Sequence, residues 1–375
     1  MTTAPPRADA EALHGVDESV NAPLPPAPEA SEERTGLPSW ARTTGRVVVA
    51  VVGALALFGL ITALKGVNPF TAYADMFGST FSSPSKIGEI FVRGTPIILA
   101  ALAVAIPARA GLVNVGGEGQ LVIGGVAAAG VALALPDLPG SVLLVLMIVA
   151  AMVAGALWAA VAALLRLWVN INESVTTLLM NYIAVDVMLF LIYDPWKDKA
   201  GSGQPATPAL PVGARLSLLG SSRVHIGIII ALVITVIVAL VLSRTSWGFR
   251  LGVVGGNAEA ARRAGLRVGL LLVTAMAVGG ALAGLGGLTQ LAGTEFKLRP
   301  GFLLGYGYIG FLASWLARHK PLPVAGAALL LSAITIGGDS LQLDSKLPAA
   351  TVNILMALVL LAVFGFSASR KAVRS

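Results

Sequence analysis

A carboxylate and two amides lie within a glycine-rich, otherwise apolar stretch that runs from Gly111 to Gly125. The three polar residues are Asn114, Glu118 and Gln120. An ionised side chain at membrane depth costs about 2.5 to 17 kcal/mol, so such residues usually mark a solute or ion path. Each glycine also weakens a helix by about 1 kcal/mol relative to alanine. A segment that is both charged and breakable predicts a transport pathway, with backbone and amide groups turned toward a polar solute.

A purely structural role is the alternative for the same segment. Glycine pairs let helices pack closely, and Glu118 would then accept hydrogen bonds from the end of a neighbouring helix. The sequence leaves both interpretations open.

A second polar group follows in the sequence Asn172-Glu-Ser-Val-Thr-Thr-Leu-Leu-Met-Asn-Tyr182. Asn172 is a typical helix N-cap, and a carboxylate at Glu173 suits the first turn of the helix dipole. Thr177 and Asn181 are four residues apart and share a face of the same helix. We expect these two side chains to line a polar cavity on the solute pathway, or alternatively Asn181 to bridge to another helix.

A third group lies in a basic loop that spans about residues 244–267. Asn257 is a typical N-cap, Glu259 favours the first helical turn, and Gly265 would end a short helix. The other residues of interest in the loop are Gly255, Arg262 and Arg263. The short helix either rests on anionic lipid as an amphipathic surface element or docks a cytoplasmic partner.

Apolar stretches must position these groups, and a transmembrane helix needs about 20 mostly apolar residues. The candidate stretches are Val47–Leu64, Ile87–Pro107, Leu112–Leu135, Val142–Leu165, Val175–Tyr193, Val224–Leu242, Val268–Leu288, Leu303–Leu316, Leu322–Gly337 and Val352–Phe366. The sequence therefore predicts an all-α, polytopic membrane protein with about ten transmembrane helices.

Basic residues concentrate in every second loop, which by the positive-inside rule places both termini in the cytoplasm. About ten crossings divide into two halves of five, and an odd number of crossings forces the halves into opposite orientation. Glycine-rich segments that begin at Gly111 and Gly301 occupy matching places in these halves. Two inverted halves with interrupted segments are a known layout of transporters.

The composition agrees with a membrane protein. Of 375 residues, 56% are hydrophobic and 12% charged, whereas soluble domains contain about 25% charged residues. The net charge of +7 comes from short clusters beside apolar runs, which indicates a bilayer partner and no nucleic acid. There is no cysteine and only three histidines, which argues against a metal site or a thiol site.

The chain divides by composition into two parts. Residues 1–44 are rich in proline and acids and predict a disordered cytoplasmic tail; residues 45–375 predict a transmembrane permease domain. Within the second part, the long loop from Asp194 to Arg223 is rich in proline and glycine. A loop of this length either serves a function, here docking of an extracellular partner, or is a solvated connector.

Together the three polar groups resemble the permease subunits of ATP-binding-cassette (ABC) importers, in the branch that handles nucleosides and simple sugars. The first motif of that branch, Asn-hydrophobic-Gly-x-Glu-Gly-Gln, matches Asn114 to Gln120. The second, Asn/Asp-Glu-x-hydrophobic-Thr-Thr-x-hydrophobic-Met/Leu-Asn-Tyr, matches residues 172–182. The coupling-loop motif, Gly-x-Asn-Pro-x-Ala-Ala-x-x-Ala-Gly, matches residues 255–265, except that Ala258 replaces its proline.

The resemblance implies a passive permease that moves nucleosides or related simple sugars and holds no cofactor. It also implies three protein partners: a cytoplasmic ABC ATPase that contacts residues 255–266, a second permease subunit, and an extracellular solute-binding lipoprotein. No Gly-x-x-x-x-Gly-Lys-Ser/Thr phosphate loop occurs in the sequence, so we expect ATP hydrolysis to come from a partner.

Two rival functions are open at this stage. An ion-coupled secondary transporter would use intramembrane carboxylates such as Glu118 and Asp186 as a relay, without an ATPase. An intramembrane enzyme would need a paired nucleophile and base or a metal cluster, and no such pairing is visible in the sequence.

Overall fold

The structure is a computed structural model that describes residues 39–201, 203–344 and 353–358. The chain separates into two units, Met1–Arg46 and Val47–Ser375, of which the second contains the helical bundle. Most of the predicted tail, residues 1–44, and most of the predicted span Val352–Phe366 lie outside the described residues. Both therefore stay predictions.

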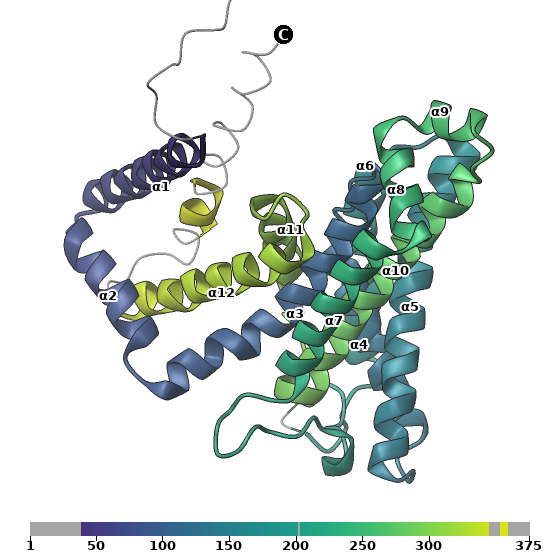
Figure 1. The fold of residues 1–375 in the computed structure, drawn as a ribbon. Coiled ribbons are helices and arrows are strands. Elements are labelled where there is room, and N and C mark those ends of the chain that lie inside the picture. Colours follow the sequence, from purple (N-terminus) through teal and green to yellow (C-terminus); the bar gives the residue numbers. More distant parts are fainter. Residues whose placement is uncertain (1–38, 202, 345–352, 359–375) are drawn as a thin grey trace, which may run out of the picture. The chain divides into compact units, whose positions relative to one another are not determined.

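The described residues form helices joined by short segments and one long loop (Figure 1). In chain order the elements are α1 (Ser39–Leu64), α2 (Pro69–Phe81), α3 (Pro84–Arg109), α4 (Gly117–Ala134), α5 (Gly140–Val169), α6 (Glu173–Tyr193), the short η2 (Val212–Ala214), α7 (Gly227–Arg244), α8 (Ser246–Gly256), α9 (Ala258–Arg263), α10 (Val268–Gln290), the π-helical η3 (Leu291–Glu295), α11 (Tyr306–Leu316) and α12 (Pro321–Asp344).

Seven of the described helices are long and apolar enough to cross a membrane. An eighth span results if the pair Val52–Leu64 and Pro69–Phe81, bent by 114°, is taken together. The all-α, polytopic class is therefore confirmed, and the predicted number of about ten crossings is an approximation.

The differences from the predicted spans have physical reasons. The predicted span Leu303–Leu316 corresponds to α11, which has 11 residues and covers only about 16 Å of a hydrocarbon core about 30 Å thick. The 13-residue α2 was not predicted, because its sequence mixes polar and apolar residues. The predicted span Leu322–Gly337 ended too early, because α12 continues to Asp344.

Glycines let α10 pack at the centre of the bundle. A Cβ added at Gly284 would lie 2.1 Å from the Ala151 carbonyl oxygen of α5, and one at Gly287 would lie 1.9 Å from the Leu121 carbonyl oxygen of α4. Neither position can hold a side chain without moving a neighbouring backbone. Small residues at helix contacts are the usual device for close packing in membranes, and here they fix α10 against α4 and α5.

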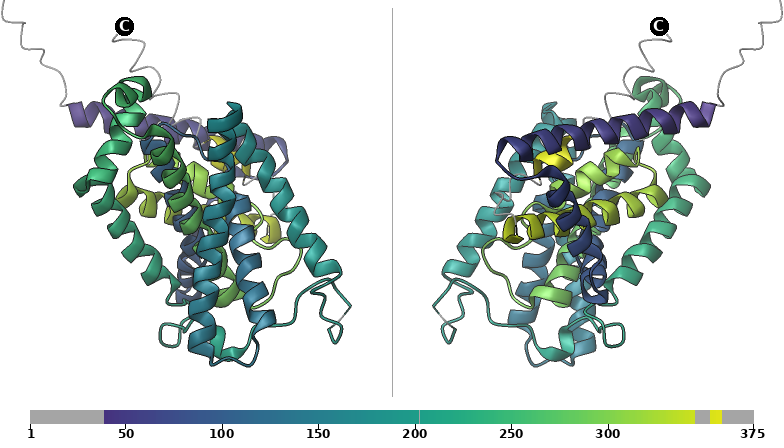
Figure 2. Two further views of the ribbon diagram at one scale, coloured as in Figure 1. Left: turned by 90° about the vertical axis from the view of Figure 1, so that its right-hand side faces the viewer. Right: turned by 90° about the vertical axis from the view of Figure 1, so that its left-hand side faces the viewer.

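The two halves of the bundle each contain an interrupted helix pair. In the first half, α3 ends at Arg109 and the chain turns back through residues 110–116 before α4 begins. In the second half, η3 ends at Glu295 and the chain turns back through residues 296–305 before α11 begins. The two breaks lie toward opposite ends of the bundle. Helices α8 and α9, labelled in Figure 1, lie at one end, and the α6–α7 loop lies at the other, as the two further views in Figure 2 also show.

The α6–α7 loop packs against the second break. The backbone N–H of Leu210 donates to the Phe296 carbonyl at 2.7 Å, and that of Leu216 donates to the Ala292 carbonyl at 2.8 Å. The Arg215 guanidinium lies 4.4 Å from the centre of the Phe296 ring. Residues 206–216 of this loop therefore pack on the break, whereas residues 217–223 are exposed.

Candidate functional site

The carboxylate of Glu118 joins the two halves of the bundle. One of its oxygens accepts a hydrogen bond from the Gly305 N–H at 2.6 Å, and the other accepts one from the Gly307 N–H at 2.7 Å. These donors lie at the N-terminal end of α11, where backbone N–H groups have no partner within the helix. Glu118 itself lies in the first turn of α4, so the N-termini of two half-helices meet at this carboxylate.

The close approach at this junction requires glycine. A Cβ added at Gly307 would lie 2.1 Å from the Glu118 backbone nitrogen. Gly305 has a φ of 86° and Gly301 a φ of 83°, in the left-handed region that glycine adopts without steric cost. The glycine-rich segment that begins at Gly301 directly contacts the segment that begins at Gly111.

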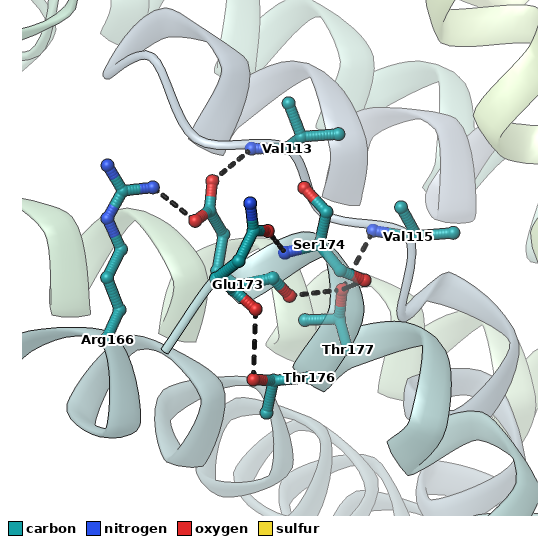
Figure 3. A network of polar contacts seen from close by, with 8 residues as sticks. Val113, Val115, Arg166, Glu173, Ser174, Thr176 and Thr177 are labelled. Carbon is teal, nitrogen blue, oxygen red and sulfur yellow. Dashed lines mark hydrogen bonds and ion pairs between the residues drawn. The ribbon is translucent and has the colours of Figure 1, made fainter. Parts of the chain in front are cut away.

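One face of α6 holds the first break in place (Figure 3). Glu173 accepts the Val113 N–H at 3.1 Å, and one turn later the Thr177 hydroxyl accepts the Val115 N–H at 3.1 Å. A turn further on, Asn181 accepts the Gly119 N–H at 2.8 Å. Two of these N–H groups belong to the non-helical break and the third, that of Gly119, to the first turn of α4. Residues at a spacing of four along α6 thus satisfy backbone groups that lipid could not.

Two further contacts complete this arrangement. Asn181 donates to the Val115 carbonyl at 3.0 Å and to the Tyr308 hydroxyl of α11 at 3.3 Å, so the expected bridge from Asn181 to another helix is present. Asn172 caps α6 by accepting the Ser174 N–H at 2.8 Å, as predicted. The other oxygen of Glu173 pairs with Arg166 of α5.

The amides of Asn114 and Gln120 bind each other. The two side chains exchange hydrogen bonds of 3.1 and 3.0 Å. Asn114 also donates to the Ala103 carbonyl of α3 at 3.0 Å and accepts the Gly116 N–H at 2.9 Å. The pair therefore links the returning chain to α3, about one and a half turns before that helix ends.

The structure brings together all five residues that were predicted for the solute pathway. Their exposed fractions range from 0% to 3%, and they are Asn114, Glu118, Gln120, Thr177 and Asn181. None of them lines either of the two cavities described below. In this conformation each of the five side chains has a structural role at the junction. For Glu118 this is the structural alternative given by the sequence. Contact of these residues with a solute stays a prediction.

The predicted coupling loop forms two helices at one end of the bundle. Asn257 accepts the Ala260 N–H at 2.9 Å and caps α9, as predicted, and Gly265 with a φ of 82° follows the helix end. Glu259 binds Arg262 at 2.5 Å and Arg263 at 3.2 Å, and all three side chains are exposed.

The preceding helix α8 was not predicted, and it changes the role of Gly255. A Cβ at Gly255 would lie 2.3 Å from the Arg109 carbonyl oxygen, so Gly255 lets α8 pack on the end of α3. Gly255 is therefore a packing contact, and the exposed surface of the loop includes α9 together with Phe249 and Arg250 of α8. This contact physically connects the loop to α3 and through it to the first break.

Sequence reasoning missed an ion-pair cluster between α3 and α12. Arg93 binds Asp339 at 2.6 Å and Glu89 at 2.9 Å. Arg93 lies about 24 Å along α3 from Arg109, within the length of a membrane crossing. The sequence does contain a signal for this cluster, because Glu89 and Arg93 lie four residues apart within the predicted span Ile87–Pro107. Asp339 was assigned to a loop because the predicted span Leu322–Gly337 ended too early.

Two cavities open at opposite ends of the described bundle. One of about 920 Å³ is lined by residues at the ends of α3, α7 and α8 and by the α11–α12 turn. The other, of about 450 Å³, lies between the α6–α7 loop and the second break, and its charged lining residues are Asp198, Glu295, Lys297 and Arg299. No group of three or more histidine, cysteine, aspartate or glutamate residues arranged for a metal ion occurs in the described part of the chain.

Comparison with known proteins identifies similar sequences over most of the chain. The family described as "Branched-chain amino acid transport system / permease component" matches residues 86–364. The chain is 35% identical to the glucose ABC transporter permease of Haloferax volcanii, over 88% of this chain and 89% of the relative.

Two nucleoside permeases are similar as well. The guanosine ABC transporter permease of Bacillus subtilis is 33% identical over 87% of this chain and 93% of its own length. A nucleoside ABC transporter permease of Lactococcus lactis is 30% identical over 84% of this chain and 88% of its own length. The family description and these names give the ion-coupled alternative no support.

Proposed function

The chain belongs to the family of branched-chain amino acid transport permease components, and we propose that it is an ABC importer permease that carries nucleosides or related simple sugars. The observation that carries this proposal is the identity of 30–35% to permeases for glucose, guanosine and nucleosides over nearly the whole chain. The multi-pass helical fold, with interrupted helices that meet between its halves, supports a transport role.

The solute class follows from what these relatives have in common. Glucose and nucleosides are small neutral molecules with a ring that carries several hydroxyl groups. Amides, hydroxyls and carboxylates recognise such rings by hydrogen bonds. We assign the solute pathway to the polar side chains at the junction and to the neighbouring helices. These side chains either contact the solute or position the backbone groups that contact it. They are Asn114, Glu118, Gln120, Thr177 and Asn181.

The Arg93 cluster supports a second part of this pathway. Charged side chains within membrane helices almost always face a bundle interior or a water-filled cavity, because lipid contact is costly. Asp339 is exposed on the surface of this single chain. A second permease subunit would close this face and create a water-filled path between the two chains.

The energy source is a separate ATPase subunit. The exposed helix α9 and its arginines lie at the basic end of the bundle, which the positive-inside rule places in the cytoplasm. ATP binding to the partner would shift α8 and α9, and the packing of Gly255 on α3 would pass that shift to the first break. A partner that binds one conformation more tightly shifts the equilibrium between the two.

Solute reaches the opposite end from an extracellular binding protein, as the family implies. The packed α6–α7 loop and the 450 Å³ cavity beside it offer that protein a shaped and charged surface. Both termini would then lie in the cytoplasm, together with the coupling loop.

Reversing the charge of the coupling helix tests the ATPase contact. Arg262→Glu combined with Arg263→Glu is expected to reduce association with the ATPase at least about tenfold, because two cations on an exposed surface become anions beside Glu259. Co-purification of the ATPase with the tagged permease measures this. Arg223→Glu, an exposed residue of the α6–α7 loop, is the matched control, and unchanged association of the double variant would contradict the coupling assignment.

Solute competition in cells tests the transport function. Cells that express the permease with its ATPase and binding protein are expected to accumulate labelled guanosine or glucose, and to lose this accumulation when the permease alone is deleted. An excess of unlabelled nucleosides or hexoses should compete, whereas branched-chain amino acids should not. Accumulation that is unchanged by the deletion would contradict the proposal.

A further inference from the structure

The larger cavity lies at the end of the bundle that carries α8 and α9. Its wall combines the last turn of α3, the last turn of α7, helix α8 and the turn between α11 and α12. These segments are far apart in the sequence, and the cavity exists only because the fold brings their ends together. Its volume of about 920 Å³ is in the range of ligand sites for molecules larger than a single ion.

The polar part of the wall is cationic. Arg109 enters from α3, and Arg318 and Lys320 enter from the α11–α12 turn, while the lining contains no aspartate or glutamate among the described residues. Neither Arg109 nor Lys320 takes part in an ion pair within the described ranges. His319 adds no charge near neutral pH, because burial lowers its pKa.

The turn that carries two of these cations is held in a fixed shape. Arg318 and His319 have φ values of 52° and 55°, a left-handed conformation that is uncommon outside glycine. The His319 N–H donates to the Ser314 carbonyl at 2.7 Å, its Nδ1 lies 3.0 Å from the Ser314 hydroxyl, and its ring packs edge-on against Trp315. The surrounding contacts therefore stabilise a strained turn.

The rest of the wall is apolar and adjoins a bilayer-facing helix. Leu242, Phe249 and Leu322 line the cavity. Leu242 lies in the last turn of α7, and the preceding turns of this helix expose Val236, Ile237 and Leu240. Exposed aliphatic side chains on a membrane-spanning helix contact lipid, so the apolar wall of the cavity is continuous with a lipid-covered surface.

We propose that this cavity binds an anionic phospholipid, with the phosphate between Arg109, Arg318 and Lys320 and an acyl chain along the end of α7. A basic site between transmembrane helices next to an apolar wall suits a lipid head group and its chain, and it does not suit a free anion or a neutral solute. The proposal depends on the multi-pass membrane fold alone and does not rest on the transported solute. The site also adjoins α8, because Gly252 packs against the Arg109 guanidinium.

Native mass spectrometry of the full chain in detergent tests this site. Phosphatidylglycerol and phosphatidylcholine with the same acyl chains are added in a titration series, and retained lipid is counted on the folded protein. Arg109→Gln combined with Lys320→Gln is expected to weaken retention of phosphatidylglycerol about twenty-five-fold, because each cation contributes about fivefold. Arg250→Gln, an exposed cation of α8 outside the lining, should leave retention unchanged, and a thermal melt of each variant verifies folding.

Three outcomes would overturn the proposal. The first is equal retention of the two lipids by the unaltered protein, and the second is a folded double variant that binds phosphatidylglycerol as before. The third is displacement of the lipid by inorganic phosphate, or by a peptide of the acidic residues 1–38, at concentrations similar to that of the lipid. Normal lipid binding by a chain that fails to transport would count against the transport function alone.

Discussion

Glu118→Ala is expected to abolish solute uptake while the permease still assembles with its ATPase. The substitution leaves the buried N–H group of Gly307 and the partly buried N–H group of Gly305 without an acceptor. Each buried group without a partner costs about 1 to 3 kcal/mol, so the junction between α4 and α11 loses its connection. Helix α9 is at the end of the bundle, and the hydrogen bonds of the Glu118 carboxylate go to Gly305 and Gly307, so ATPase binding should persist.

Uptake of the labelled solute and co-purification of the ATPase measure the two effects in one set of variants. Glu118→Gln keeps one carbonyl acceptor and should retain intermediate uptake. Asp137→Ala removes an acid from the exposed turn between α4 and α5 and should behave as the unaltered protein. Normal uptake by Glu118→Ala would remove Glu118 from the mechanism.

Reversing one charge of the Arg93–Asp339 pair is expected to reduce uptake by about tenfold or more. Arg93→Asp would place three acids together, since Glu89 and Asp339 both bind Arg93 at present. An unpaired charge at this depth costs at least about 2.5 kcal/mol. Asp339→Arg alone should be similarly harmful, because it would place two guanidinium groups side by side.

The double variant Arg93→Asp with Asp339→Arg restores one pair of opposite charges across α3 and α12. Uptake by this variant should recover to well above that of either single variant. Lys86→Asp is the matched control, because Lys86 is an exposed cation in the first turn of the same helix α3, and charges at exposed positions contribute little to stability. If uptake by the double variant is no higher than uptake by the single variants, the ion pair between these two positions is not required for transport.

The sequence could predict the parts of the fold that depend on local chemistry. The caps at Asn172 and Asn257 were correct because a side-chain oxygen at an N-cap binds an N–H only two or three residues away. Most long apolar stretches were correct because the bilayer itself selects their length and composition. The shared face of Thr177 and Asn181 followed from helical spacing, and the structure extends that face to Glu173.

Contacts between distant segments could not be predicted in the same way. Nothing local indicates that Glu118 accepts hydrogen bonds from Gly305, which is 187 residues away. The pairing of Arg93 with Asp339, 246 residues apart, has the same origin. The start of α11 was missed because an apolar, glycine-containing sequence has the same composition whether it crosses the bilayer or enters it only halfway.

The polar junction also shows why residue type alone does not distinguish a side chain that stabilises the backbone from one that contacts the solute. Amides and carboxylates can satisfy the backbone of a broken helix or the hydroxyl groups of a sugar ring, and both require burial and precise placement. At the junction all five predicted side chains are occupied by the chain itself. The solute would therefore have to compete for these groups in another conformation, or bind nearby.

The most direct test of the account uses sealed vesicles that contain the purified permease. With its ATPase, its binding protein and ATP, the protein should concentrate a labelled nucleoside or hexose. Without the ATPase it should concentrate neither, even when a proton or sodium gradient is imposed. Accumulation driven by an ion gradient in vesicles that contain this chain alone would contradict the account.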